Sequence, residues 1–197
     1  LGRAVDAHIS AVKNPLRDAY SFAAIRFLKE NLPAAVKNPG DKKAALAVAN
    51  AAAMSGCAFS NTQTSPLHKL GQIFHEMQHL HPGILMGMCL PHILGDYLKK
   101  GGYDLSELLH PLVWDDEFAQ TPQAARADAA LAVLERFLAD LYAALGKDMP
   151  RTLKEAGIPN YRMDDIQDAL GQDQDGVYLR TVISRIRENK STAEKKG

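Results

Sequence analysis

Five of the seven histidines in this chain lie between positions 68 and 92, close enough in sequence to raise the question of metal chemistry. His75, Glu76 and His79 form the pattern H-E-x-x-H. On a helix, this spacing places two imidazoles on one face to bind Zn²⁺, and the glutamate can act as a general base for a bound water. Such a hydrolase needs a third ligand, for which Asp96 and Glu107 are candidates without an extended motif. A zinc hydrolase is therefore a distant alternative.

The elements that position these histidines are predicted to be helices, because runs that alternate apolar and polar residues are scarce. The patterns predict helices over 15–33, 42–57 (placed centrally), 67–80, 84–99 (interrupted by Pro91), 123–145, 163–170 and 176–188, with a short one beginning at Thr152. Gly146 stands where a C-terminal cap belongs, and 101–121 reads as irregular. We expect residues 1–197 to form a single all-α, multi-helix domain.

The composition is that of a globular protein, with 46% apolar and 23% charged residues. Lys+Arg and Asp+Glu both number 23, so no basic field attracts nucleic acid or an anionic membrane. No apolar run approaches the ~20 residues that a membrane-spanning helix needs. Cys57 and Cys89 lie in apolar stretches and are expected to be buried free thiols of a reducing compartment, which predicts a cytoplasmic protein.

Five stretches of the sequence carry a family resemblance, and they follow one another in the family's order with nearly its spacing. They are Ile9-Ser10 with Asn14–Ala19 (family pattern "VS…NPxxDA"), Ala24–Val36, Ser55–Asn61 ("AGxAFSNA"), Leu90–His92 ("LLPxV") and Leu145–Gly157 ("LGLPxxLxEAG"). With these stretches, almost the whole chain resembles the C-terminal helical domain of the iron-containing, or group III, alcohol dehydrogenases.

The resemblance implies a function for the longer protein to which such a domain belongs. In this family, the helical domain holds a divalent metal through one Asp and three His, facing an N-terminal domain that binds NAD(P). The metal, Fe²⁺ or Zn²⁺, polarises the oxygen of a small alcohol or aldehyde so that hydride can pass to or from nicotinamide. The chain opens at Leu1 without Met and has no Gly-rich phosphate loop, so we expect a fragment that lacks the N-terminal domain. Family resemblance also implies a homo-oligomer.

The family's metal ligands are only partly retained when they are carried over without gaps. The Asp falls just before Leu1, and the first His falls on Arg3, which is permanently charged and cannot bind a cation. The second falls on His68 and the third on Pro82, while an additional active-site His falls on Gln72. One ligand is visibly intact, so the alternative is a metal-free, non-catalytic homologue that acts as a structural or interaction domain.

A gapped comparison leaves a second set of candidates. His75 to His79 also resembles the family's "HAMAH", with His81 standing for the third ligand, but this needs a seven-residue insertion and a matching deletion. The candidate metal ligands are therefore His68, His75, His79 and His81. The structural interpretation makes the last three polar residues around a helix end.

Several other side chains have simpler expected roles. Arg3 is hypothesised to fill the vacated metal space and contact carboxylates, and Asp6 to act as a cap or ion-pair partner. The apolar side chains of Met86 and Met88, like that of Cys89, are expected to fill the core. Trp114 is expected to anchor the irregular segment.

Overall fold

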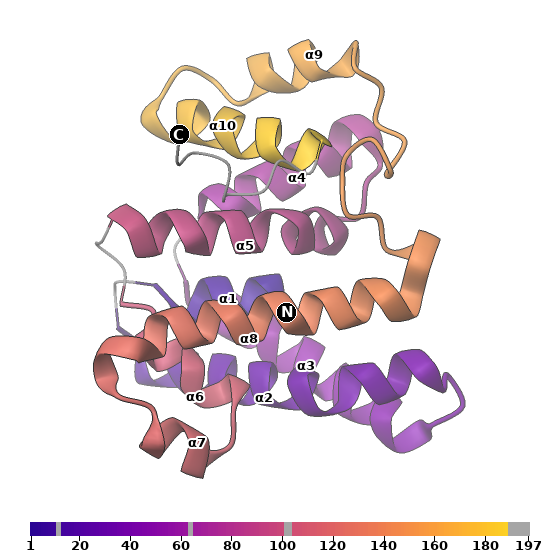
Figure 1. The fold of residues 1–197 in the computed structure, drawn as a ribbon. Helices are drawn as coiled ribbons and strands as arrows, with labels where there is room; N and C mark the ends of the chain where they lie inside the picture. The colour runs from indigo at the N-terminus through magenta and orange to yellow at the C-terminus, as the bar shows by residue number, and fades with distance from the viewer. Residues whose placement is uncertain (11–12, 63–64, 101–103, 189–197) are drawn as a thin grey trace. The chain divides into compact units, whose positions relative to one another are not determined.

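The computed structural model describes residues 1–10, 13–62, 65–100 and 104–188, and these residues form helices and no strand (Figure 1). The helices are α1 (Gly2–His8), α2 (Pro15–Lys37), α3 (Lys42–Ser60), α4 (Pro66–Gln78), α5 (Pro82–Lys100), α6 (Leu109–Leu112), α7 (Asp115–Gln120), α8 (Arg126–Leu145), α9 (Arg162–Ala169) and α10 (Gln174–Glu188). Short 3₁₀ turns, η1 (Ser106–Leu108), η2 (Gln123–Ala125) and η3 (Gly146–Asp148), link some of them. The predicted all-α fold is confirmed.

The chain divides into two compact units. The first comprises Leu1–Gln63 with Asp96–Leu145, and the second comprises Thr64–Gly95 with Gly146–Gly197. Helix α5 runs through the boundary and contributes to both. Whether the units behave as the predicted single domain stays a prediction.

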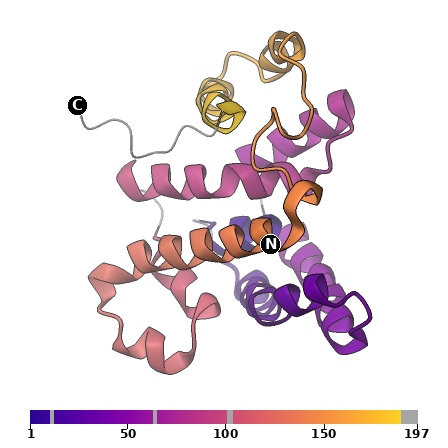
Figure 2. The ribbon, with the colours of Figure 1, turned by 45° about the vertical axis from the view of Figure 1, so that its right-hand side comes forward.

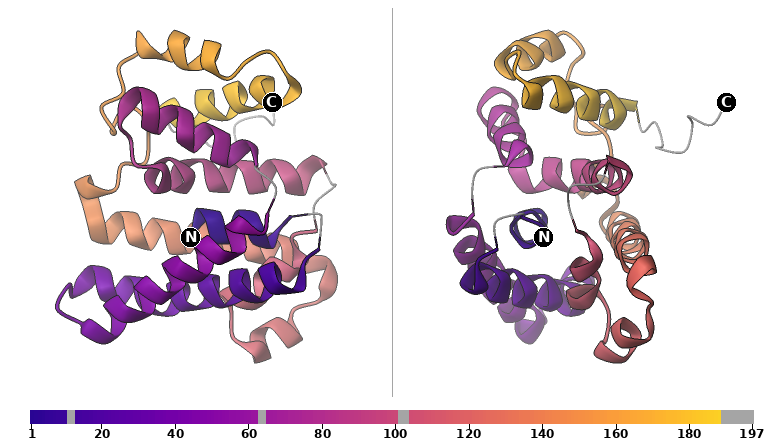
Figure 3. Two further views of the ribbon diagram at one scale, coloured as in Figure 1. Left: turned by 180° about the vertical axis from the view of Figure 1, so that it is seen from behind. Right: turned by 90° about the vertical axis from the view of Figure 1, so that its left-hand side faces the viewer.

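In the first unit, α2 and α3 pack side by side and α1 lies against both (Figure 3). Asn14 begins α2, because its side chain accepts hydrogen bonds from the N–H groups of Leu16 (3.0 Å) and Arg17 (3.3 Å). The predicted end of this helix near Pro33 is wrong, since α2 continues to Lys37 with the proline inside it. A proline so close to the end of a helix removes a single backbone hydrogen bond there.

Helix α3 does not occupy the central position predicted for it. Its buried residues are Ala44, Ala51, Ser55 and Ala58, and the Leu46 side chain is 63% exposed. These small side chains lie on one face of α3, which packs on α1 and α2. Much of the remaining helix surface is exposed. Cys57 lies on this open part and is exposed, so its predicted burial is wrong, whereas Cys89 is buried.

The rest of the first unit is helical where irregular structure was expected. Most of 104–120 lies in η1, α6 and α7, while 101–103 lie outside the described residues. Helix α8 has the predicted amphipathic pattern and buries Ala130, Leu134, Phe137, Leu138 and Leu141. It ends where Gly146 has a φ of 55°, so the predicted cap is confirmed.

In the second unit, α9 and α10 lie beside α4 (Figure 2). The predicted interruption of α5 at Pro91 is wrong, because the helix is continuous from Pro82 to Lys100. The segment after Thr152 forms turns rather than a short helix. Its capping contacts still form: the Thr152 hydroxyl accepts from Glu155 N (3.0 Å), and the Glu155 carboxylate accepts from Arg151 N (2.7 Å). In the described part of the chain, no helix is long and apolar enough to cross a bilayer.

Candidate metal centre

His68, the one intact family ligand, lies in the first turn of α4. The Ser65 hydroxyl caps this helix by accepting a hydrogen bond from the His68 backbone N–H at 3.1 Å. The imidazole is half-buried. Gln72 is exposed one turn later, and Pro82 is the first residue of α5. Of these three family positions, only His68 carries the imidazole that the resemblance implies as a metal ligand.

The H-E-x-x-H pattern does not lie on one helix. Helix α4 ends at Gln78, and His79 follows as its C-cap with a left-handed φ of 53°. The backbone N–H of His79 closes the last turn on the His75 carbonyl at 3.0 Å. The expectation that His75 and His79 share a helical face is therefore wrong, and the geometry counts against the zinc hydrolase.

His81 has a local structural contact at the start of the next helix. Its Nδ1 accepts a hydrogen bond from the Gly83 backbone N–H at 3.1 Å. All three imidazoles of 75–81 are exposed. These contacts agree with the interpretation that the three histidines are polar residues around a helix end. Their assignment as metal ligands stays a prediction.

The described residues offer no complete metal site. Across 1–10, 13–62, 65–100 and 104–188, no three His, Cys, Asp or Glu side chains form a group that could hold a metal ion. The three family histidine positions within the chain hold Arg3, His68 and Pro82, so two of the three imidazoles are replaced. This donor set does not fit a divalent metal, because a stable site needs three or four converging donors.

Helix α1 carries the other side chains of interest. Arg3 is exposed, and its guanidinium carbon lies 5.5 Å from the centroid of the Phe59 ring. Among the described residues it forms no ion pair, so the hypothesis that it contacts carboxylates in a vacated metal space is not supported. Asp6 is buried.

His8, at the end of α1, is a polar contact that the sequence analysis missed. Its Nδ1 lies 3.0 Å from the Ser21 hydroxyl, and its Nε2 lies 3.3 Å from the Glu107 carbonyl. Burial lowers the pKa of His8, opposed by the hydrogen bond to Glu107. In a neutral imidazole, Nε2–H donates to the Glu107 carbonyl, and Nδ1 shares the single Ser21 hydroxyl proton with the Asp18 carbonyl, which lies 3.0 Å from that hydroxyl. His8 therefore ties α1 to α2 and to η1 within the first unit.

Core positions near the candidate ligands are as predicted. Met86, Met88 and Cys89 in α5 are each at most 3% exposed. Burial also raises the pKa of the Cys89 thiol, which keeps it protonated and a poor ligand. Trp114 is different: it is 68% exposed, so it does not anchor its segment by burial.

Comparison with known proteins places this geometry in a family. The family model described as "Fe-containing alcohol dehydrogenase family, C-terminal" matches residues 1–178. The chain is 28% identical over 173 residues to long-chain-alcohol dehydrogenase 1 of Geobacillus thermodenitrificans, covering 87% of this chain and 42% of the relative. It is 26% identical over 158 residues to 1,3-propanediol dehydrogenase of Citrobacter freundii, covering 80% and 39%. The chain thus spans less than half the length of these relatives.

Solved structures share the fold. A 1,3-propanediol oxidoreductase superposes with a TM-score of 0.73 at 20% identity, over 94% of this chain and 49% of that one. An alcohol dehydrogenase from Oenococcus oeni gives 0.74 at 17% identity, again over 94% and 49%. With residues 1–178 matched and the helical architecture shared, the chain belongs to the iron-containing alcohol dehydrogenase family and corresponds to its C-terminal domain.

Proposed function

We propose that this chain is the helical domain of an NAD(P)-dependent oxidoreductase that acts on small alcohols or aldehydes. The observation that carries the proposal is the match of residues 1–178 to the family's C-terminal domain. The relatives' names, long-chain-alcohol dehydrogenase and 1,3-propanediol dehydrogenase, support an alcohol as the substrate class, and the second name supports a small one. NAD(P) would bind through a dinucleotide-binding domain outside these 197 residues, and the helical domain would form the other wall of the substrate site.

A second candidate function is favoured by the ligand positions. Arg3 and Pro82 supply no metal donor, and His68 alone would hold Fe²⁺ or Zn²⁺ weakly. In this second proposal, the homologue binds no metal, does not turn over alcohols, and serves as a structural or interaction domain. The two proposals share the fold and differ in one measurable property, which is stoichiometric retention of a metal ion.

The experiment that separates them uses the protein in which this chain is joined to its dinucleotide-binding domain. The purified protein would be incubated with Fe²⁺ or Zn²⁺, desalted and analysed for metal by mass spectrometry. NADH and NADPH oxidation would then be followed with a series of small aldehydes. Near-stoichiometric metal together with turnover would support the oxidoreductase. Protein that is folded by circular dichroism but retains no metal and shows no turnover would support the second proposal.

Two further properties belong to the proposal. A cytoplasmic location is supported by the free thiols of Cys57 and Cys89. Homo-oligomer formation is supported by the open apolar side chains of Leu46 in α3 and Leu16 in α2, which are 63% and 56% exposed. Analytical ultracentrifugation measures the assembly directly, and a monomer at all concentrations would contradict it.

A further inference from the structure

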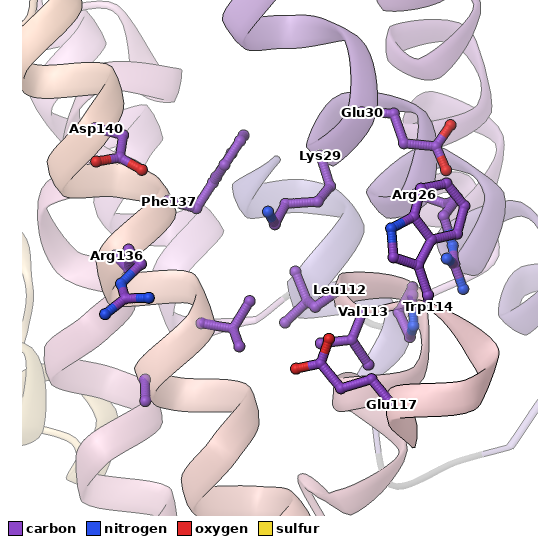
Figure 4. Close-up of a pocket in the computed structure, with 13 residues that line it drawn as sticks. Arg26, Lys29, Glu30, Leu112, Val113, Trp114, Glu117, Arg136, Phe137 and Asp140 are labelled. Atoms are coloured by element: carbon purple, nitrogen blue, oxygen red, sulfur yellow. The ribbon is translucent and has the colours of Figure 1, made fainter. Parts of the chain in front are cut away.

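A cavity unrelated to the candidate ligands lies wholly within the first unit. It has a volume of about 550 Å³, within the usual range of small-molecule sites. Helix α2 forms one wall and α8 the other, and Pro111–Trp114 with Glu117, which run from the end of α6 into the first turn of α7, close one end (Figure 4). Because all these elements belong to one unit, the cavity is a property of that unit alone.

The floor of the cavity is apolar and its mouth is aromatic. Leu112, Val113 and Phe137 are buried and contribute to the lining. Trp114, which is 68% exposed, stands at the side of the cavity. Its indole lies on Arg26, whose guanidinium carbon is 5.5 Å from the ring centroid. An exposed indole beside an apolar floor is suited to contact a planar ring.

Charges of both signs line the cavity: the side chains of Lys29 and Arg136 are cationic, and those of Glu30, Glu117 and Asp140 are acidic. Lys29 extends from α2 into the open space, with its ammonium 5.4 Å from the centroid of Phe137, and Arg136 lies on the opposite wall. Glu117 points toward the same space from α7. Neither the two cations nor this carboxylate forms an ion pair with any described residue. Arg26 is the exception, because it binds the His110 carbonyl (2.8 Å) and Asp115 (3.3 Å).

We propose that this cavity binds a small zwitterionic aromatic compound of the class of the aromatic α-amino acids. The ligand's ring lies against the exposed indole of Trp114, its carboxylate is held by Lys29 and Arg136, and its ammonium faces Glu117. A neutral ligand would leave these charges unused, and a ligand with one charge would satisfy one side only. This site is independent of the oxidoreductase proposal.

The test exploits Trp114, the only tryptophan in the chain. L-Phenylalanine, hydrocinnamate (which lacks the ammonium) and phenethylamine (which lacks the carboxylate) do not absorb at the red edge of tryptophan absorption. Each can therefore be titrated into the 197-residue chain while Trp114 emission is followed. We expect saturable binding of phenylalanine, with each singly charged analogue weaker by about fivefold or more. Equal affinity for all three compounds, or no saturable change with phenylalanine, would overturn the proposal.

Paired variants separate the two charge contacts. Lys29→Gln should weaken phenylalanine about fivefold and leave phenethylamine unchanged, whereas Glu117→Gln should weaken phenylalanine and leave hydrocinnamate unchanged. Lys43→Gln in α3 and Glu135→Gln in α8, exposed residues outside the cavity lining, are the matched controls. Far-UV circular dichroism checks that each variant is folded. Equal losses in the variants and their controls would show that the charges at the cavity do not select the ligand.

Discussion

At the scale of single residues, Arg3 and Pro82 distinguish this chain from the set of metal ligands that the resemblance implies for its family. Both stand where the resemblance places a histidine, and neither can donate electrons to a cation. The substitutions that would restore donors are therefore Arg3→His and Pro82→His, made in the protein that carries the dinucleotide-binding domain.

We expect the double variant Arg3→His/Pro82→His to bind Zn²⁺ more tightly than the parent, on the order of tenfold or more for each added imidazole. The reason is that the resemblance implies a set of three imidazoles, in which these two positions accompany His68. Competition with a fluorescent chelator measures the affinity. Arg3→Ala/Pro82→Ala removes the same two side chains without adding a donor, and an equal gain in that control would show that the ligand alignment is wrong.

His8 gives a second prediction at this scale. Its pKa in the folded chain is lowered by burial, so the unfolded chain binds the proton more readily. The stability that neutral His8 contributes is then fully present above its ordinary pKa of 6.5 and is lost as pH falls toward the folded value. Urea titrations from pH 7.5 downward should show the free energy of unfolding decreasing below about pH 6.5.

The His8→Gln variant isolates this effect, because glutamine keeps a donor but does not titrate. Its free energy of unfolding should be lower than the parent's near neutral pH and should depend less on pH in the same range. An unchanged pH dependence would assign the acid sensitivity to other groups.

The sequence could reveal His68 but not His8, for a physical reason. A ligand position is recognised from neighbours close in sequence, whereas the partners of His8 lie 13 and 99 residues away in the chain. The cavity between α2 and α8 was missed in the same way, since Lys29, Glu117 and Arg136 come from three separate elements. Side chains that only long-range packing brings together cannot be recognised from a short sequence motif.

At the scale of helices, caps could be predicted well and interior prolines could not. Asn14 and Gly146 act as the sequence indicates, because a cap depends on a few adjacent residues. Pro33 and Pro91 were expected to end or interrupt their helices, yet both lie inside α2 and α5. A proline removes one backbone hydrogen bond, and packing along a helix of 19 or 23 residues offsets that loss.

The end of α4 provides a prediction that distinguishes a ligand from a cap. His79 has a left-handed φ of 53°, which a residue with a Cβ adopts at a cost of about 1 kcal/mol relative to glycine. His79→Gly should therefore raise the free energy of unfolding by about 0.5–1 kcal/mol, measured by urea titration. His75→Gly, inside the last turn, should lower it by a similar amount. If His79→Gly is more stable than the parent but binds Zn²⁺ less well, then His79 is a metal ligand as well as a helix cap.

Two glycines in different helices make a matched pair. A Cβ on Gly176, in the first turn of α10, would lie 2.5 Å from the Gly171 carbonyl oxygen and 2.6 Å from that of Leu170. Gly176→Ala should therefore lower the free energy of unfolding by ~1–3 kcal/mol, because backbone atoms must move. Gly56 lies in the interior of α3, and a Cβ added there would meet nothing within 4 Å, so Gly56→Ala should raise it by ~1 kcal/mol. Thermal melts followed by circular dichroism compare both with the parent, and loss of stability in both variants would contradict the argument.

At the scale of the whole molecule, the property to test is whether two compact units unfold as one domain. The chain passes between the units at three points, and one of these, between Gly95 and Asp96, lies inside the uninterrupted helix α5. Ile93 and Leu94 on one side of this point and Asp96 on the other are buried. Unfolding of either unit would therefore fray a helix whose buried residues belong to both.

This continuity predicts a single cooperative transition. Trp114 lies in the first unit and is the only tryptophan, so its fluorescence reports that unit, whereas far-UV circular dichroism reports the helices of both. In urea, the two signals should give the same midpoint within error and the same dependence on denaturant, as for one two-state domain. A difference between the fluorescence and circular dichroism midpoints would mean that the two units unfold separately and that α5 breaks at Gly95. The variants at Gly176 and Gly56 would then shift different transitions, because they lie in different units, whereas in a single domain both shift the same one.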